Sequence, residues 1–560
     1  MVALLLFCSS ALGVPLQQVL NEELNRAVEA LASEEPGVHY AAVSVETVDR
    51  LSLAATSGVV DKKDAWATRY LDVDLRVGTP KLDSTHPLRG ANSWRGESRG
   101  PIEVAWGEDP DQAIRQSVWK EIERRYRDAA EAIVLVEAEQ NVKVAEEHPA
   151  PDFSESSPQQ ATVDVPRIQL ALLAWEAALV EVSAVLDADP AVESSGVSLL
   201  AKRTDTVFVD TDGASLVHGR CDYSLVLSVT ATVQDGDEVR ATKRYQAHEE
   251  SRLPAKEDLL LVAEELVGEL RSKLQAPRGE PWSGPVLLSG EAAGVFFHEV
   301  LGHRLEGHRQ KRDWEGKTFL DRLGEPILPE AVGIVDDPTL EQFAGVDLNG
   351  HYGFDHEGVP AQRTVLVEDG VLRGFLMSRS PIGGFPQSSG HGRRSPGSAP
   401  LARMGNLVVQ VEDGESRERL RERLRALAKA QGLEYGLLVD GIEGGFTATG
   451  RVTPNAFNVR THNSWRVWVD GRPDERVRGI DLVGTPLVAF ESLVGFGDVA
   501  GVFNGTCGAE SGWVPVSAVS PDMLFSHLEI QRKEKAEARP PLLERPEGAE
   551  EEELGAALLQ

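Results

Sequence analysis

The sequence predicts a two-domain α+β protein whose C-terminal domain consists mostly of strands. A length of 560 residues allows two or more domains with separate cores. A hydrophobic content of 41% and 52 glycines are typical of a globular, strand-rich chain. The Gly- and Pro-containing segment Arg278–Gly284 divides alternating helix and strand patterns from a part dominated by strands. We therefore expect an N-terminal α/β domain over 14–278, with a mixed or antiparallel sheet, and a C-terminal β-barrel-like or sandwich domain over 284–532.

Before residue 278, apolar periodicity predicts helices and strands in alternation. The expected helices are 16–32, 111–136 and 256–275. Strands are expected at 39–45 and 51–56, which we predict to pair with each other, at 69–77, and several times between 204 and 248. Asp-Gly pairs at 212–213 and 235–236 should form turns in that last region. Segment 146–160, rich in Pro and Ser, indicates an exposed loop, and 167–188 fits a helix or a strand.

After residue 284, short apolar runs separated by turn residues predict a strand-rich domain. The expected strands are 285–288, 332–335 and 407–411, with hairpins at 364–376 and 465–471. One charged segment, 416–431, has the pattern of a surface helix. From residue 533 onward Pro, Glu and Ala dominate, which predicts a disordered acidic tail over 533–560.

The overall charge excludes one class of function. The formal net charge is −32 and the isoelectric point is near 4.9. Nucleic-acid binding requires clustered Lys and Arg to neutralise phosphates, so we expect no nucleic-acid partner. No stretch approaches about 18 unbroken apolar residues, so we expect no membrane span.

The first 13 residues form a short apolar run that ends in small residues. Ala11 and Gly13 resemble the small residues of a signal-peptidase site. The run lacks a basic segment before it, which a signal peptide normally has. Residues 1–13 therefore favour export to the periplasm only slightly over a cytoplasmic location.

Two histidines that flank a glutamate form the main candidate site, at His298-Glu299-Val-Leu-Gly302-His303. Imidazole is the commonest metal ligand among side chains, and a glutamate beside the first histidine is where zinc peptidases keep their general base. A regular helix would place residues 298 and 303 about 140° apart, too far for one ion. We predict a helix that starts near Gly290 and breaks at Gly302, which brings His303 back toward His298. The alternative is a solvated, histidine-rich helix end.

A catalytic zinc needs a third protein ligand, drawn from His, Glu, Asp or Cys. The segment Gly505-Thr-Cys507-Gly508 places a cysteine between glycines, which predicts a turn that presents the sulfur. The alternatives are a small buried core thiol, or a disulfide between Cys221 and Cys507 that would exclude the metal site.

Three motifs in the same order resemble the TldD/PmbA family of metallopeptidases, in its metal-bearing, TldD-type branch. They are the His298–Gly307 segment, the loop Ser389–Arg394 with Arg403-Met404-x-Asn406, and Asn504–Gly508. The resemblance covers about residues 284–530 well and the N-terminal part loosely. It implies metal ligands at His298, His303 and Cys507, with Glu299 as the general base. It departs from the family at His308, where an acidic residue is expected, so the role of His308 stays open.

The resemblance further implies a peptidase that acts on unfolded or modified peptides, with zinc as the cofactor or iron in its place. It also implies enclosure of the site in a homodimer or in a heterodimer with a metal-less paralogue, and a cytoplasmic location. The rival function is a non-catalytic structural or binding subunit of such a complex. From the residues, we predict that His391, Arg393 and Arg394 line the substrate cleft, because glycines let their backbone approach a ligand and their side chains can donate hydrogen bonds. A plain surface loop is the alternative.

Overall fold

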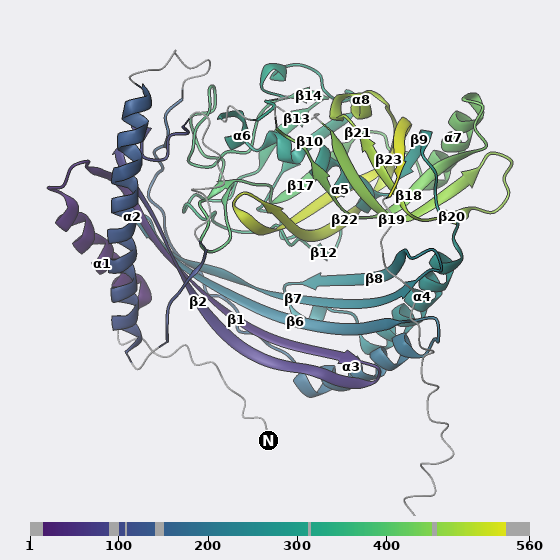
Figure 1. Cartoon of the computed structure of the whole chain (residues 1–560), viewed down its shortest axis with the longest axis horizontal. Coiled ribbons are helices and arrows are strands. Elements are labelled where there is room, and N and C mark those ends of the chain that lie inside the picture. Colours follow the sequence, from purple (N-terminus) through teal and green to yellow (C-terminus); the bar gives the residue numbers. More distant parts are fainter. Residues whose placement is uncertain are drawn as a thin grey trace, which may run out of the picture.

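The computed structural model describes residues 15–88, 100–106, 109–140, 150–311, 315–317, 319–450 and 456–533. The expected signal segment 1–13 and all but the first residue of the expected tail 533–560 lie outside these residues. The predicted strand-rich α+β architecture is confirmed, and its strands form two large sheets (Figure 1). In the described part of the chain, no helix combines the length and apolar character needed to cross a membrane.

Long antiparallel strands form the first sheet, which has eight strands. The long strands are β1 (Val38–Thr56), β2 (Val59–Thr79), β6 (Ser194–Asp210), β7 (Ser215–Thr232) and β8 (Glu238–Ala247). The short strands β3 (Leu82–Asp83), β4 (Ile102–Glu103) and β5 (Gln160–Thr162) lie at its edges, and β5 alone pairs in parallel, with β7. The predicted turns at 212–213 and 235–236 connect β6 to β7 and β7 to β8.

One strand prediction is wrong. Segments 39–45 and 51–56 do not pair with each other, because both belong to the 19-residue strand β1. The chain reverses only at Ser57-Gly58, where both residues have positive φ, and β2 then pairs back along β1. Positive φ at both central residues is the geometry of the tight hairpin turn that matches strand twist.

Four helices cover one face of this sheet. They are α1 (Leu16–Leu31), α2 (Pro110–Gln140), α3 (Leu172–Asp187) and α4 (Lys256–Gln275), so segment 167–188 is mainly helical. Their apolar residues pack on the odd-numbered side chains of β1, such as Val43 and Leu53. The even-numbered side chains, from Tyr40 to Glu46, lie on the opposite face and are also buried. That face is turned toward the C-terminal part of the chain (Figure 1).

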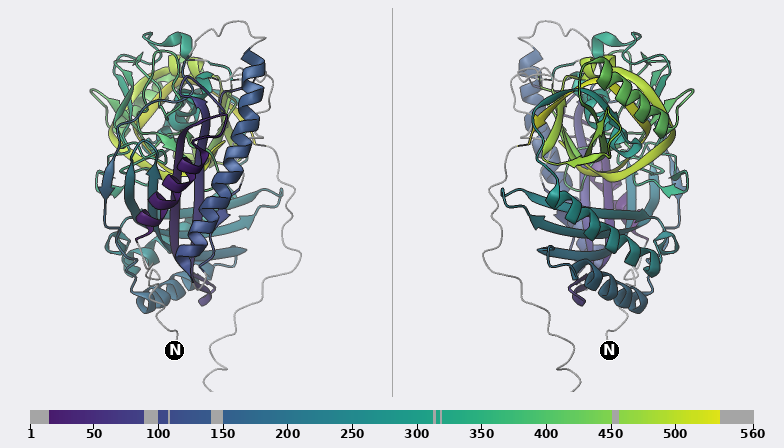
Figure 2. Two further views of the ribbon diagram at one scale, coloured as in Figure 1. Left: turned by 90° about the vertical axis from the view of Figure 1, so that its left-hand side faces the viewer. Right: turned by 90° about the vertical axis from the view of Figure 1, so that its right-hand side faces the viewer.

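The second sheet closes into a ring of five strands. The ring consists of β9 (Trp282–Leu288), β18 (Tyr435–Thr447), β19 (Phe457–Trp468), β21 (Ile480–Gly484) and β23 (Gly512–Arg532). Each pairs with the next, and β23 pairs again with β9, which gives the predicted barrel-like form (Figure 2). Further strands extend the sheet: β10 (Val332–Asp336), β13 (Thr364–Glu368), β14 (Val371–Leu372), β17 (Asn406–Val411), β20 (Glu475–Val477) and β22 (Leu493–Ala509). Smaller elements complete this part: the strand pairs β11 (Gln342–Phe343) with β12 (Val346–Asp347) and β15 (Gly392–Arg393) with β16 (Leu401–Ala402), and the helices α7 (Arg417–Ala430) and α8 (Pro486–Glu491).

A buried helix, α5 (Gly290–Val300), packs against β18, β22 and β23. Ser289 caps it by accepting a hydrogen bond from the Ala292 amide. Its apolar side chains, including the fully buried Phe296 and Phe297, belong to the largest core of the protein. The 3-10 helix η3 (Gly302–Leu305) and the short helix α6 (His308–Lys311) follow directly. The C-terminal end of α5 is thus held rigidly inside the second sheet.

Candidate metal centre

Three predicted donors meet at one point. His298 lies in the last turn of α5, His303 lies in η3, and Cys507 lies in β22. Cys507 Sγ is 3.2 Å from His298 Nε2 and 3.3 Å from His303 Nε2. The three donor atoms lie within 4.8 Å of one another, and each residue is only 6% exposed. Two segments about 200 positions apart in the sequence therefore form a single buried cluster.

The predicted helix break before His303 is present. The α-helix ends at Val300, and the tighter η3 begins at Gly302. Gly302 is needed for space and not for a left-handed backbone, since its φ is not positive. A Cβ at this position would lie 2.1 Å from Met404 Sδ, so a larger residue would require the Met404 side chain or the turn to move.

Cys507 does not sit on a turn, as the flanking glycines suggested. It pairs with Val514 inside the long hairpin of β22 and β23, whose tip follows at Glu510-Ser511. The strand forms there because β23 supplies buried partners, which the local sequence does not reveal. Cys221 lies in β7, and both Cys221 and Cys507 are free thiols. The alternative of a disulfide between them is excluded in this structure.

Charged residues that the sequence analysis gave no role surround the donors. Glu306 is fully buried, and its Oε1 lies 3.3 Å from His303 Nδ1. Its other oxygen accepts a hydrogen bond from Arg309 Nε at 2.9 Å. Arg403, also fully buried, lies 3.2 Å from Cys507 Sγ and 3.2 Å from Glu306 Oε1. A carboxylate behind a ligating histidine is the usual support of such a ligand in metal sites.

These neighbours set the protonation of the donors. Burial raises the pKa of the Cys507 thiol, but the imidazoles of His303 and His298 and the Arg403 guanidinium outweigh it and hold this pKa well below its usual value. Burial lowers the pKa of His303, and the charges of Cys507 and Glu306 reverse this, so the net shift is strongly upward. Both shifts favour a thiolate paired with a protonated imidazole when no metal is bound. A metal ion would take the place of that proton.

The donor set fits zinc. Two imidazole nitrogens and one thiolate are ligands of the type that zinc takes in proteins, and three protein ligands leave a fourth position open. The ring nitrogens Nε2 of both histidines face the sulfur, and Arg403 supports the thiolate form. Iron also accepts imidazole and thiolate donors, so the donor set alone leaves both metals open.

Glu299 lies beside the donors without joining them. Its Oε2 is 4.0 Å from His303 Nε2, and its side chain is 14% exposed. It packs against Gly445 in β18, where an added Cβ would come within 2.8 Å of Glu299 Cγ. The carboxylate is thus held at the edge of the cluster.

His308, whose role the sequence left open, is not one of the three donors. It is buried, and its Nε2 lies 4.0 Å from Glu510 Oε2. Arg309 holds Glu510 with two hydrogen bonds, at 2.8 and 2.9 Å. Burial raises the pKa of Glu510, but Arg309 and His308 together outweigh it and lower this pKa to about 2. His308 therefore belongs to the charged network around the tip of the β22–β23 hairpin.

The loop predicted to line the substrate cleft is packed inside the protein. His391 is fully buried and lies 3.1 Å from Asp336, and Arg393 contacts the Met404 carbonyl and the Tyr352 ring. Arg394 donates to Asp72 at 2.6 Å and to Ser44 at 2.8 Å, both on the inner face of the first sheet. Their polar atoms contact protein groups, and none belongs to the donor cluster. The contacts of Arg394 favour a role in joining the two sheets, and those of His391 and Arg393 favour a role in packing the C-terminal part, over the predicted role in binding substrate.

Replacing Arg394 by Met should therefore lower stability and leave catalysis intact. Asp72 and Glu46 would remain buried without their cation, and breaking a buried ion pair typically costs about 3–5 kcal/mol. Denaturant unfolding measures the change. Arg322→Met, which breaks an exposed pair with Glu325, is the control and should cost less than about 1 kcal/mol. An Arg394→Met protein with unchanged stability and a raised KM would restore the substrate-binding interpretation.

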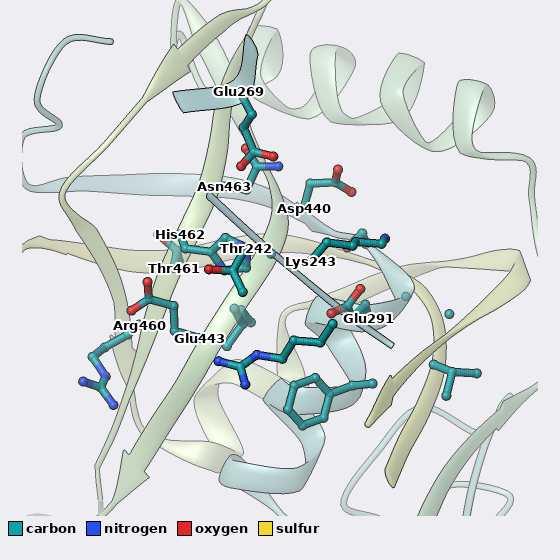
Figure 3. Close-up of a pocket in the computed structure, with 18 of the residues that line it drawn as sticks. Thr242, Lys243, Glu269, Glu291, Asp440, Glu443, Arg460, Thr461, His462 and Asn463 are labelled. Carbon is teal, nitrogen blue, oxygen red and sulfur yellow. The ribbon is translucent and has the colours of Figure 1, made fainter. Parts of the chain in front are cut away.

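A large cavity lies between the two sheets, with a volume of about 1700 Å³. In Figure 3, Lys243 lies near Glu291 on one side, and Glu443, Arg460 and His462 lie on the other. The cavity meets α5 at its first residues, Gly290 and Glu291, whereas His298 lies in its last turn, about 12 Å away along the helix. It also reaches Thr506, the residue before Cys507. The cavity therefore extends from the start of α5 to the residue beside one of the three donors.

Comparison with known proteins agrees with this geometry. Residues 282–532 match the family model of the PmbA/TldA metallopeptidase C-terminal domain. A metalloprotease of Methanothermobacter thermautotrophicus is 30% identical over 340 residues, which is 59% of this chain and 68% of that protein. A zinc metalloprotease TldD homolog of Saccharolobus solfataricus is 23% identical over 248 residues, 44% of this chain and 51% of that protein.

The fold is similar to that of a solved structure, TldE from Thermococcus kodakarensis. The TM-score is 0.58 at 14% identity, over 92% of this chain and all of that one. The structural likeness extends across both sheets, whereas the family model matches only the second. Together with the 30% identity to the archaeal metalloprotease, these matches show that the chain belongs to the TldD/PmbA family of metallopeptidases.

Proposed function

We propose that this protein is a metal-dependent peptidase with its metal held by His298, His303 and Cys507. The observation that carries the proposal is the convergence of these three donors, with Glu299 beside them. When bound, a zinc ion would polarise the scissile carbonyl and lower the pKa of a water molecule toward about 7. The relative from Saccharolobus solfataricus is named a zinc metalloprotease, which supports zinc over iron.

The role proposed for Glu299 follows from its place. Its carboxylate takes a proton from the attacking water and delivers it to the leaving amine. Because it lies 4.0 Å from His303 and packs against Gly445, it can reach a water molecule at the open side of the cluster without rotating into the core. His303, held from behind by Glu306, stays aligned while this proton moves.

The proposed substrates are unfolded or modified peptides. The cavity of about 1700 Å³ exceeds the usual 300–1000 Å³ of small-molecule sites and suits an extended chain better than a folded domain. Its wall carries charges of both signs, including Lys243, Arg460 and Glu443, which can pair with the side chains and termini of a peptide. Strand β22 borders this space, so an extended peptide could also add to a strand edge.

A second subunit is proposed to close the site. The similarity to TldE supports a heterodimer with a metal-less paralogue, and a homodimer is the alternative. Enclosure would protect folded proteins from hydrolysis. The rival function, a non-catalytic subunit, is disfavoured because the donors and Glu299 are all retained in one cluster.

One experiment on the protein purified alone tests the proposal. We expect one equivalent of bound zinc by elemental analysis, hydrolysis of an unstructured fluorogenic peptide, loss of this activity with a chelator, and its return with zinc. Light scattering on the same sample reports whether the chain assembles with itself. A folded protein that binds neither zinc nor iron would contradict the proposal and favour the non-catalytic role.

A further inference from the structure

Arg403 connects the thiolate donor to the carboxylate behind His303. It lies just after β16 and before β17, and its side chain is fully buried. A buried guanidinium is stable only when its charge is compensated. Both terminal nitrogens of Arg403 donate hydrogen bonds, and its Nε lies within ion-pair distance of a carboxylate oxygen without a hydrogen bond to it. Nη1 donates to Ser511 Oγ at 3.0 Å and to the Gly512 carbonyl at 3.1 Å. The tip of the hairpin that carries Cys507 is therefore tied to this one side chain.

The other nitrogens reach the donor cluster. Nη2 donates to the Cys507 carbonyl at 2.9 Å and lies 3.2 Å from Cys507 Sγ. Nε lies 3.2 Å from Glu306 Oε1, and the same oxygen lies 3.3 Å from His303 Nδ1. One rigid, planar group thus spans two of the three donors, the sulfur directly and His303 through Glu306. Another buried arginine nearby, Arg309, contacts Glu306 and Glu510 and not the sulfur.

We propose that Arg403 is a positioning residue that fixes the thiolate against His303 and draws electron density from its sulfur. The proposal rests on the proposed function, since it concerns the metal bound by that cluster. A thiolate donor places more negative charge on a metal than an imidazole does, which weakens the metal as a Lewis acid. An N–H group and a positive charge directed at the sulfur oppose that effect, and hydrogen bonds around a cysteine ligand are known to tune metal sites.

The rigid guanidinium of arginine, which carries its N–H donors in a fixed planar arrangement, matters for this role. Lysine carries the same charge on a single ammonium, whereas two different nitrogens of Arg403 lie 3.2 Å from the sulfur and 3.2 Å from Glu306. A purely structural arginine would affect stability and leave the electronic state of the sulfur unchanged. Arg379 provides that comparison, because it is also fully buried. It binds the Ser154 carbonyl and Asp212 and contacts none of the three donors.

Cobalt titration of the metal-free protein separates these roles, because a cobalt–thiolate bond has a sulfur-to-metal charge-transfer band. We compare wild type, Arg403→Met, Arg403→Lys and Arg379→Met, and measure cobalt affinity by competition with a chelator. For Arg403→Met we expect the band to move to lower energy, since the sulfur becomes richer in electrons, and the affinity to fall about 10- to 100-fold, as for other partners of metal ligands. Arg379→Met should keep the wild-type band and affinity.

Arg403→Lys should lie between Arg403→Met and wild type in both measurements. If circular dichroism shows that Arg403→Met does not fold, Arg403→Lys serves as the test. A wild-type band and affinity in that variant would overturn the proposal. The same result in a folded Arg403→Met protein would overturn it too. A wild-type protein that binds cobalt without a thiolate band would instead refute the metal centre itself.

Discussion

Glu299→Gln is expected to abolish peptide hydrolysis while the metal stays bound. Glutamine has nearly the same shape, so the contact with Gly445 is kept, but an amide does not accept the proton of the attacking water. A positioned general base contributes about 10²- to 10⁴-fold to a rate, and kcat/KM should fall by a factor in this range. Kinetics on an unstructured peptide and elemental analysis of the same preparation measure both properties.

The control for this substitution is Glu325→Gln. Glu325 forms an exposed pair with Arg322, so its replacement removes the same charge from the protein without touching the cluster. It should keep both metal and rate. Near wild-type turnover by Glu299→Gln would assign the proton transfer to another group, and loss of its metal would make Glu299 a ligand.

Cys507→Ala should remove both the metal and the activity. The substitution deletes one of three donors and leaves Arg403 without the thiolate that it faces. Loss of a hydrogen-bonding partner of a ligand already lowers metal affinity about 10- to 100-fold, so loss of the ligand itself should lower it by more than about 100-fold. Chelator competition gives the affinity, and the peptide assay gives the rate.

Cys221→Ala is the matched control, because Cys221 is a buried free thiol in β7 of the other sheet. It should retain the metal with unchanged affinity. If Cys507→Ala binds zinc as wild type does, the sulfur is not a ligand, and the cluster needs a different third donor.

The sequence predicted the His298–His303 part of this site correctly because its geometry depends on neighbouring residues. The sequence around Gly302 requires a break for two histidines five residues apart to meet, and the structure has that break. Cys507 was predicted as a donor from its resemblance to a family motif, but its strand was not, since β23 decides it from the other side of a hairpin. The extended course of β1 was missed for the same reason: its ladder with β2 continues through Asp49 and Arg50.

The features that the sequence did not predict depend on interactions between segments that are distant in the chain. The hydrogen bonds of Arg394 to Asp72 and Ser44 join residues more than 300 positions apart. Without them, a Gly- and Arg-rich loop has the composition of a ligand-binding surface. Arg403 stood in a recognised motif, but only its place between Cys507 and Glu306 shows what it does.

The separation of the donors along the chain also sets an order of events during protein synthesis. His303 precedes Cys507 by 204 residues. At about 5–20 residues per second, a ribosome needs about 10–40 s to add that length. A nascent or truncated chain therefore carries the histidines and the glutamate but no complete site. The last donor arrives only when the hairpin of β22 and β23 can form, so the proposed metal centre cannot be complete before this hairpin has been made.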